Sequence, residues 1–181
     1  SNREQANKMS LNLDEHISKT PGFPKEGITF YDISPALEDA DTLSKMIAEM
    51  VGLAKAYQPD IIAGLDARGF LFSMPLALAL GCGTVMIRKA GKLPGKVIET
   101  SYALEYGEAR LSIQASRAIK NKRVVLCDDL LATGGTLTAG ARLIEQAGGI
   151  LAGAVCVIEL TGLKGRQKLG CDVSALQCYE F

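Results

Sequence analysis

Residues 123–136 read RVVLCDDLLATGGT and form the most informative stretch of this chain. Residues 124–127 are an apolar, β-branched run of the kind that fills a buried parallel strand. Two adjacent carboxylates, Asp128 and Asp129, follow where we expect that strand to end. A short turn at 132–136 then opens onto a segment of helical character at 137–147. This order predicts a strand, a ligand-binding turn and a helix of an α/β fold.

The turn has the chemistry of a phosphate site. A helix N-terminus leaves backbone N–H groups without partners, and the helix dipole places partial positive charge there. Gly134 and Gly135 permit close approach of the backbone, while Thr133 and Thr136 add hydroxyl donors. The turn is not a Walker A loop, because no Gly-Lys-Ser/Thr follows at the required spacing.

The acid pair suits a sugar better than a phosphate. Asp128 and Asp129 would repel a phosphate but accept hydrogen bonds from two neighbouring sugar hydroxyls. The alternative is an Asp-rich strand end followed by an ordinary helix cap and glycine turn. The strand, acid pair and helix in sequence favour a ribose 5-phosphate site over that alternative.

Composition excludes several classes of protein. The chain has 181 residues, of which 48% are hydrophobic, and 20 basic residues balance 20 acidic ones, so we expect no nucleic-acid partner. The apolar stretches are too short for a membrane span, and the polar N-terminus lacks a signal-peptide core. Five cysteines without a Cys-x-x-Cys pair indicate neither a zinc site nor a disulfide framework, so we expect a reducing, cytoplasmic location. His16 is the one histidine, which argues against a Ser-His-Asp mechanism.

Hydrophobic periodicity predicts strands alternating with helices. We expect helices over 2–18, 41–57 and 70–80, strands over 28–31, 60–65, 84–88, 150–160 and 174–179, and a hairpin or mobile flap between 97 and 113. The pattern predicts an α/β fold with a mostly parallel sheet flanked by helices. We expect a single domain over 1–181, with a small hood lobe formed by about residues 20–35 and the C-terminal part.

Further candidate groups follow other predicted strands. Arg68 comes directly after one strand and has a planar fork suited to phosphate or pyrophosphate; it could equally be a surface arginine. Arg88, Lys89 and Lys92 follow the next strand and form either an anion site or a solvated basic turn.

The flap segment carries Glu105 and Tyr106. Glu105 could exchange a proton with a ring nitrogen while a closed flap excludes water; it could also be an exposed hairpin acid. Phe30 could stack on a planar base, although an aromatic side chain in a short strand is commonly part of the core.

Six stretches closely resemble the adenine-specific branch of the type I phosphoribosyltransferase family. They are 27–35 (GITFYDISP), 62–72 (IAGLDARGFLF), 87–95 (IRKAGKLPG), 101–107 (SYALEYG), 124–136 (VVLCDDLLATGGT) and 159–169 (ELTGLKGRQKL). The resemblance implies that the chain is a pentosyltransferase of purine salvage, in which adenine and phosphoribosyl pyrophosphate give AMP and pyrophosphate. It also implies Mg²⁺, held mainly through substrate phosphates and ribose, and a homodimer.

The resemblance implies a role for each matching residue. Ala132, Thr133, Gly134, Gly135 and Thr136 would hold the 5-phosphate, Asp128 and Asp129 the ribose hydroxyls, and Ala67, Arg68, Arg88 and Lys92 the pyrophosphate. Phe30, Tyr31 and Leu160 would contact adenine, Glu105 would transfer a proton, and Tyr106 would belong to the closing flap. A cis peptide between Asp66 and Ala67 is also implied. Tyr31 stands where many family members carry Arg, and Ala67 where Ser is frequent.

Two other functions remain open from the residues. One is a phosphoribosyltransferase for hypoxanthine, guanine or xanthine, because base specificity depends on the small lobe. The other is a non-catalytic regulator that senses phosphoribosyl pyrophosphate, against which the neutral net charge argues.

Overall fold

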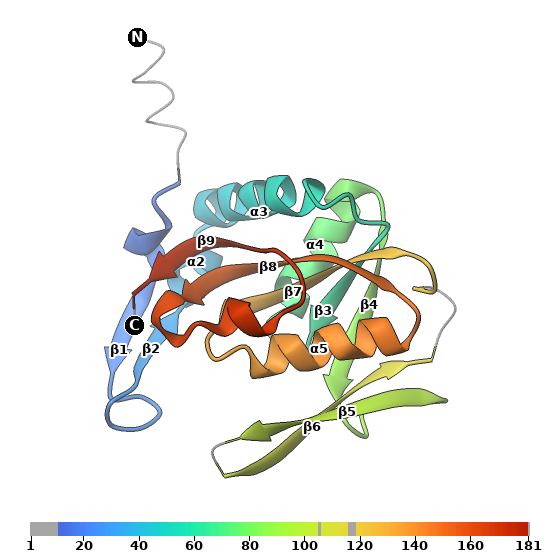
Figure 1. Ribbon diagram of the computed structural model, residues 1–181. Coiled ribbons are helices and arrows are strands. Elements are labelled where there is room, and N and C mark those ends of the chain that lie inside the picture. Colours follow the sequence, from blue (N-terminus) through green and yellow to red (C-terminus); the bar gives the residue numbers. More distant parts are fainter. Residues whose placement is uncertain (1–10, 105, 116–118, 181) are drawn as a thin grey trace. The chain divides into compact units, whose positions relative to one another are not determined.

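The computed structural model describes residues 11–104, 106–115 and 119–180 (Figure 1). The chain divides into two compact units, Ser1–Glu49 and Met50–Phe181. The described part contains no helix with the length and apolar character needed to cross a membrane.

The first unit contains a two-stranded antiparallel sheet. A 3₁₀ turn, η1 (Leu13–His16), precedes β1 (Ser18–Pro21), which pairs with β2 (Thr29–Asp32). Helix α2 (Ser34–Glu38) follows, and α3 (Ala40–Lys55) begins in this unit. The helix expected over 2–18 is wrong in its described part, where only the short 3₁₀ turn Leu13–His16 forms, Ile17 is already extended, and Ser18 begins the strand that pairs with β2. Strand pairing with a distant segment overrode a weak local helical pattern.

The second unit is built on a seven-stranded sheet in the order β5-β6-β4-β3-β7-β8-β9. Its strands are β3 (Ile61–Leu65), β4 (Gly83–Lys89), β5 (Val97–Leu104), β6 (Gly107–Gln114), β7 (Arg123–Leu131), β8 (Ile150–Leu160) and β9 (Val173–Tyr179). Neighbours from β4 through β9 are parallel, while β5 and β6 form an antiparallel hairpin that pairs with the edge of β4. The mostly parallel sheet and the hairpin confirm the predicted fold class.

Helices cover both faces of this sheet. Helix α4 (Phe70–Leu80) packs on β3 and β7 from one side, and α5 (Gly135–Gln146) packs from the other, beside the β5–β6 hairpin (Figure 1). All five residues of β3 are buried, as a strand covered on both faces requires. Two short 3₁₀ turns, η2 (Thr161–Leu163) and η3 (Gly165–Lys168), connect β8 to β9.

One boundary differs from the sequence-based expectation in a way that affects the site. Strand β7 does not end before the acid pair but continues to Leu131, because its ladder with β8 still pairs Leu130 with Ile158 and Leu131 with Glu159. Asp128 and Asp129 therefore lie inside a strand and not after its end, and both line the same cavity.

The strand order places a crevice where β3 and β7 end. From β3 the chain crosses to β4 on one side, whereas β7 occupies the other side. Parallel sheets bind ligands at such a switch point, outside the carboxyl ends of the strands.

Candidate functional site

A cavity of about 340 Å³ occupies this switch point. Three segments of the second unit supply most of its wall: the turn after β3, the end of β7 and the start of α5. Two side chains from other strands complete it. The lining residues are Asp66, Ala67, Arg68, Lys89, Tyr102 and every residue from Asp128 to Leu137.

The turn into α5 presents backbone donors to this cavity. Gly134 has a φ of +87°, a left-handed conformation that favours glycine, and it directly precedes α5. Among the described residues no side chain caps this helix end, and its first turn contains no acid. The first N–H groups of α5 and the hydroxyls of Thr133 and Thr136 are thus available to an anion.

The acid pair forms the inner part of the cavity. Asp128 is 8% exposed, and its Oδ1 accepts a hydrogen bond of 2.9 Å from the Asp129 backbone N–H. Burial raises the pKa of Asp128 well above its usual value, and the neighbouring charge of Asp129 raises it further. The ionised form of this carboxyl is therefore destabilised in the free protein. A nearby cation or a set of hydroxyl donors would offset that destabilisation.

Asp129 already has a cationic partner. Arg68 Nε donates to Asp129 Oδ2 at 2.5 Å, so the turn after β3 reaches across to the end of β7. The Arg68 side chain remains about half exposed, whereas Asp129 is largely covered. The cis peptide expected between Asp66 and Ala67 is present, which confirms that prediction.

The basic residues Arg88, Lys89 and Lys92, at the end of β4 and in the turn after it, have different surroundings in the structure. Arg88 Nε lies 3.3 Å from Asp66 Oδ2, while the Lys89 backbone N–H donates to the same oxygen at 3.4 Å. The described residues that line the cavity include Lys89 but neither Arg88 nor Lys92. Lys92 lies in the turn after β4, where its N–H donates to the Lys89 carbonyl.

The hairpin supplies one lining residue and carries the candidate flap. Tyr102 on β5 lines the cavity, and Tyr106, which is 86% exposed, lies at the hairpin tip. Glu105 is outside the described residues, so its proton-transfer role remains a prediction.

The three candidate base-contacting residues come from two parts of the chain. Phe30 and Tyr31 lie on β2 of the first unit, where the Phe30 ring packs edge-on against Phe23 with centroids 5.4 Å apart. Leu160 ends β8 in the second unit and is 7% exposed.

The lining residues that were not predicted as site residues are Asp66, Lys89, Tyr102, Leu130, Leu131 and Leu137. Lys89 was grouped with Arg88 and Lys92, and the alternation of side chains along β4 could have separated it from Arg88. Tyr102 has no sequence signal beyond its place in the flap, because its position depends on how the hairpin packs beside α5.

Known proteins match this chain over nearly its whole length. The model of the family described as "Phosphoribosyl transferase domain" matches residues 30–175. The adenine phosphoribosyltransferase of Gluconobacter oxydans is 50% identical over 170 residues, which cover 94% of this chain and 95% of that protein.

Solved structures agree in fold. Adenine phosphoribosyltransferase from Saccharomyces cerevisiae, complexed with an imino-altritol bisphosphate and adenine, superposes with a TM-score of 0.88 at 40% identity, covering 94% of this chain and 99% of that one. The enzyme from Thermoanaerobacter pseudethanolicus gives a TM-score of 0.86 at 46% identity, covering 92% and 98%. Because the family match extends over most of the chain and the likeness to these relatives is close, the chain belongs to the phosphoribosyl transferase family, among the adenine phosphoribosyltransferases.

Proposed function

We propose that this protein transfers the 5-phosphoribosyl group of phosphoribosyl pyrophosphate to adenine, giving AMP and pyrophosphate in purine salvage. The observation that carries the proposal is one cavity in which an open helix N-terminus, two adjacent carboxylates and an arginine face the same space. The close, nearly full-length likeness to adenine phosphoribosyltransferases supports adenine as the base.

The ribose 5-phosphate half of the reaction is assigned to β7 and α5. Residues 132–136 bind the 5-phosphate through backbone N–H groups and threonine hydroxyls. Asp128 and Asp129 accept hydrogen bonds from the ribose hydroxyls. In the transition state the ribose carries positive charge near C1, and fixed carboxylates nearby stabilise that charge.

Binding of the pyrophosphate requires the Arg68 guanidinium to exchange one partner for another. Arg68 is paired with Asp129 in this structure, and we assign both groups to substrate contacts. Binding of phosphoribosyl pyrophosphate transfers the Arg68 guanidinium to the pyrophosphate and frees Asp129 for the ribose. Ala67 contributes backbone contacts, and Arg88 and Lys92 provide positive charge further out.

Adenine recognition is assigned to Phe30, Tyr31 and Leu160. Phe30 stacks on the base, the backbone near Tyr31 contacts the exocyclic amine, and Leu160 covers the other face of the ring. Glu105 takes the proton that the adenine nitrogen loses as it bonds to C1, while Tyr106 moves with the flap and excludes water.

Magnesium fits the donor chemistry of the cavity. Three carboxylates and two cationic side chains line it, so an anionic substrate needs additional positive charge there. Mg²⁺ keeps several waters and binds largely through substrate phosphates, so we expect the ion to be held mainly by the phosphates and ribose of the substrate, next to Asp128 and Asp129. When bound, the ion would neutralise charge on the departing pyrophosphate.

We further propose that the protein is a homodimer, with residues 1–181 forming one phosphoribosyltransferase domain. Leu71, Met74 and Leu78 are each more than half exposed and recur at helical spacing on α4, so they form an apolar face suited to a second copy.

A cytoplasmic location is supported by the cysteines, because all five are described and all are free. We propose small molecules, not nucleic acid or membrane, as its ligands.

The decisive experiment measures AMP formation from phosphoribosyl pyrophosphate with adenine, hypoxanthine, guanine or xanthine, each with and without Mg²⁺. We expect AMP to form only when adenine is the base and Mg²⁺ is present. Comparable turnover of another purine would overturn the substrate assignment, and binding of phosphoribosyl pyrophosphate without turnover of any base would favour the regulator.

A further inference from the structure

The turn between β7 and α5 is in direct contact with the segment that follows β8. A methyl group on Gly134 would lie 2.5 Å from the Gly165 carbonyl oxygen. A methyl group on Gly165 would lie 2.9 Å from the Gly134 nitrogen and closer still to the Ala132 oxygen. The two backbones touch, so the position of Gly165 sets how far the turn can move toward η3.

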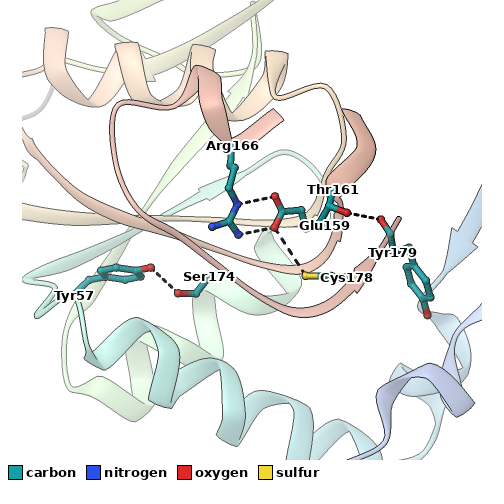
Figure 2. Close-up of polar contacts among 7 residues, drawn as sticks. All are labelled: Tyr57, Glu159, Thr161, Arg166, Ser174, Cys178 and Tyr179. Carbon is teal, nitrogen blue, oxygen red and sulfur yellow. Dashed lines mark hydrogen bonds and ion pairs between the residues drawn. The ribbon is translucent and has the colours of Figure 1, made fainter. Parts of the chain in front are cut away.

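An ion pair holds Gly165 in this place. Arg166 Nε donates to Glu159 Oε2 at 2.8 Å and Nη2 donates to Oε1 at 2.5 Å, a bidentate pairing (Figure 2). Glu159 is 2% exposed, whereas the Arg166 side chain is about half exposed and closes over it. The hydrogen bond to Glu159 raises the pKa of the Arg166 guanidinium, so this arginine stays charged.

The sheet register brings the ion pair next to the turn. Glu159 lies opposite Leu131 of β7, the residue directly before Ala132, and opposite Cys178 of β9 on its other side. Figure 2 shows the Glu159 carboxylate between Arg166 and the Cys178 sulfur, which lies 4.0 Å from Oε1. The Glu159 backbone is therefore fixed between β7 and β9, and its carboxylate contacts the Cys178 thiol as well as Arg166.

We propose that Glu159, Gly165 and Arg166 form a brace that positions the 132–136 turn for the 5-phosphate, an inference that rests on the proposed function. The brace does not touch the ligand. It fixes the backbone of η3, and η3 fixes the direction of the N–H groups that bind the phosphate. These three are positioning residues, beyond those assigned to substrate contact.

The test compares binding of two probes, ribose 5-phosphate and inorganic pyrophosphate, by isothermal titration calorimetry. Gly165→Ala introduces a methyl group against the turn, and Arg166→Lys keeps the charge but loses the bidentate fork. We expect both variants to weaken ribose 5-phosphate binding, Gly165→Ala by about tenfold to a hundredfold, because small displacements of binding groups have effects of that size. Pyrophosphate binding is expected to be unchanged.

Two control variants separate positioning from general damage. Gly170 has a clear space of 4 Å around its missing methyl group among the described residues, so Gly170→Ala should bind both probes like the wild type. Arg123 makes hydrogen bonds to the Tyr57 and Gln58 carbonyls at the opposite end of β7. Arg123→Lys should lower the Tm without changing ribose 5-phosphate affinity.

The outcomes are distinct. A folded Gly165→Ala or Arg166→Lys variant with wild-type affinity for ribose 5-phosphate overturns the brace, as does equal weakening of both probes. If Gly165→Ala does not fold, Arg166→Lys decides the matter. A wild type that binds no ribose 5-phosphate also overturns the brace, whereas one that binds it but forms no AMP refutes only the proposed function.

Discussion

Replacing Asp128 with Asn should make the free protein more stable and a poorer enzyme. The carboxyl is 8% exposed, and burial and the charge of Asp129 both raise its pKa. Asn has nearly the same volume and can still accept the hydrogen bond from the Asp129 N–H, so the substitution removes the buried charge without leaving a cavity. A gain of about 0.5–2 kcal/mol is typical for relieving such a strained functional site.

The stability that Asp128→Asn gains over the wild type should depend on pH. Because the native pKa of Asp128 lies above the unfolded value, the native state holds this proton more tightly than the unfolded chain. Below the unfolded pKa the carboxyl is neutral in both states and the wild type carries no penalty. As pH rises through the native pKa, the wild type loses stability that Asp128→Asn retains, so the difference in Tm grows with pH.

Thermal unfolding of both proteins from pH 4.5 to 8 measures this effect. A change of 1 kcal/mol moves the Tm by about 2–4 °C in a chain of this size, so we expect a rise of about 1–8 °C at the upper end. Asp172→Asn is the matched control, because Asp172 is exposed and precedes β9. A variant less stable than the wild type at pH 8, or a difference that shrinks as pH rises, would refute the reasoning. Loss of turnover in Asp128→Asn should accompany the gain in stability.

Three other substitutions test separate parts of the proposal. Glu105→Gln should lower kcat by about 10²–10⁴-fold, the usual contribution of a proton-transfer group, with little change in the affinity for phosphoribosyl pyrophosphate; unchanged turnover would rule out the assigned role. Arg68→Gln should weaken pyrophosphate binding by about tenfold to a hundredfold, since it removes a charged hydrogen-bond donor, and calorimetry with pyrophosphate checks this. Leu78→Asp puts a charge on the apolar face of α4, so sedimentation should show a monomer; an intact dimer would place the interface elsewhere.

Much of the second unit could be predicted from local pattern. The helix at Phe70–Leu80 and the strand at Ile150–Leu160 match the expected bounds, and β3 and β9 differ by one residue. These segments are strongly apolar, and their composition separates helix from strand: the helix contains no Ile, Val or Thr, whereas β3 and β8 contain β-branched residues. The first unit was harder, because β1 is a short, fully exposed strand that exists only through its pairing with β2.

The candidate site was predictable as a set of residues but not as a set of contacts. The glycine turn and the acid pair are close together in the chain, so their chemistry can be predicted without a structure. The pairing of Arg68 with Asp129 joins residues 61 positions apart. Alternation along β4 could have separated Lys89 from Arg88, but which of the two lines the cavity depends on the packing of the sheet.

By itself, the sequence determined most strands and helices of the second unit, that a helix N-terminus with glycines follows an acidic strand, and which family the motifs resemble. These features depend on neighbours within a few residues, where propensity and side-chain chemistry act directly. Only the tertiary structure decided that β7 extends past the acids, that Arg68 pairs with Asp129, and that Gly165, next to the Glu159–Arg166 pair, contacts the turn at 132–136. Each of these depends on strand register and on burial, which arise when distant segments pack together and which no local pattern encodes.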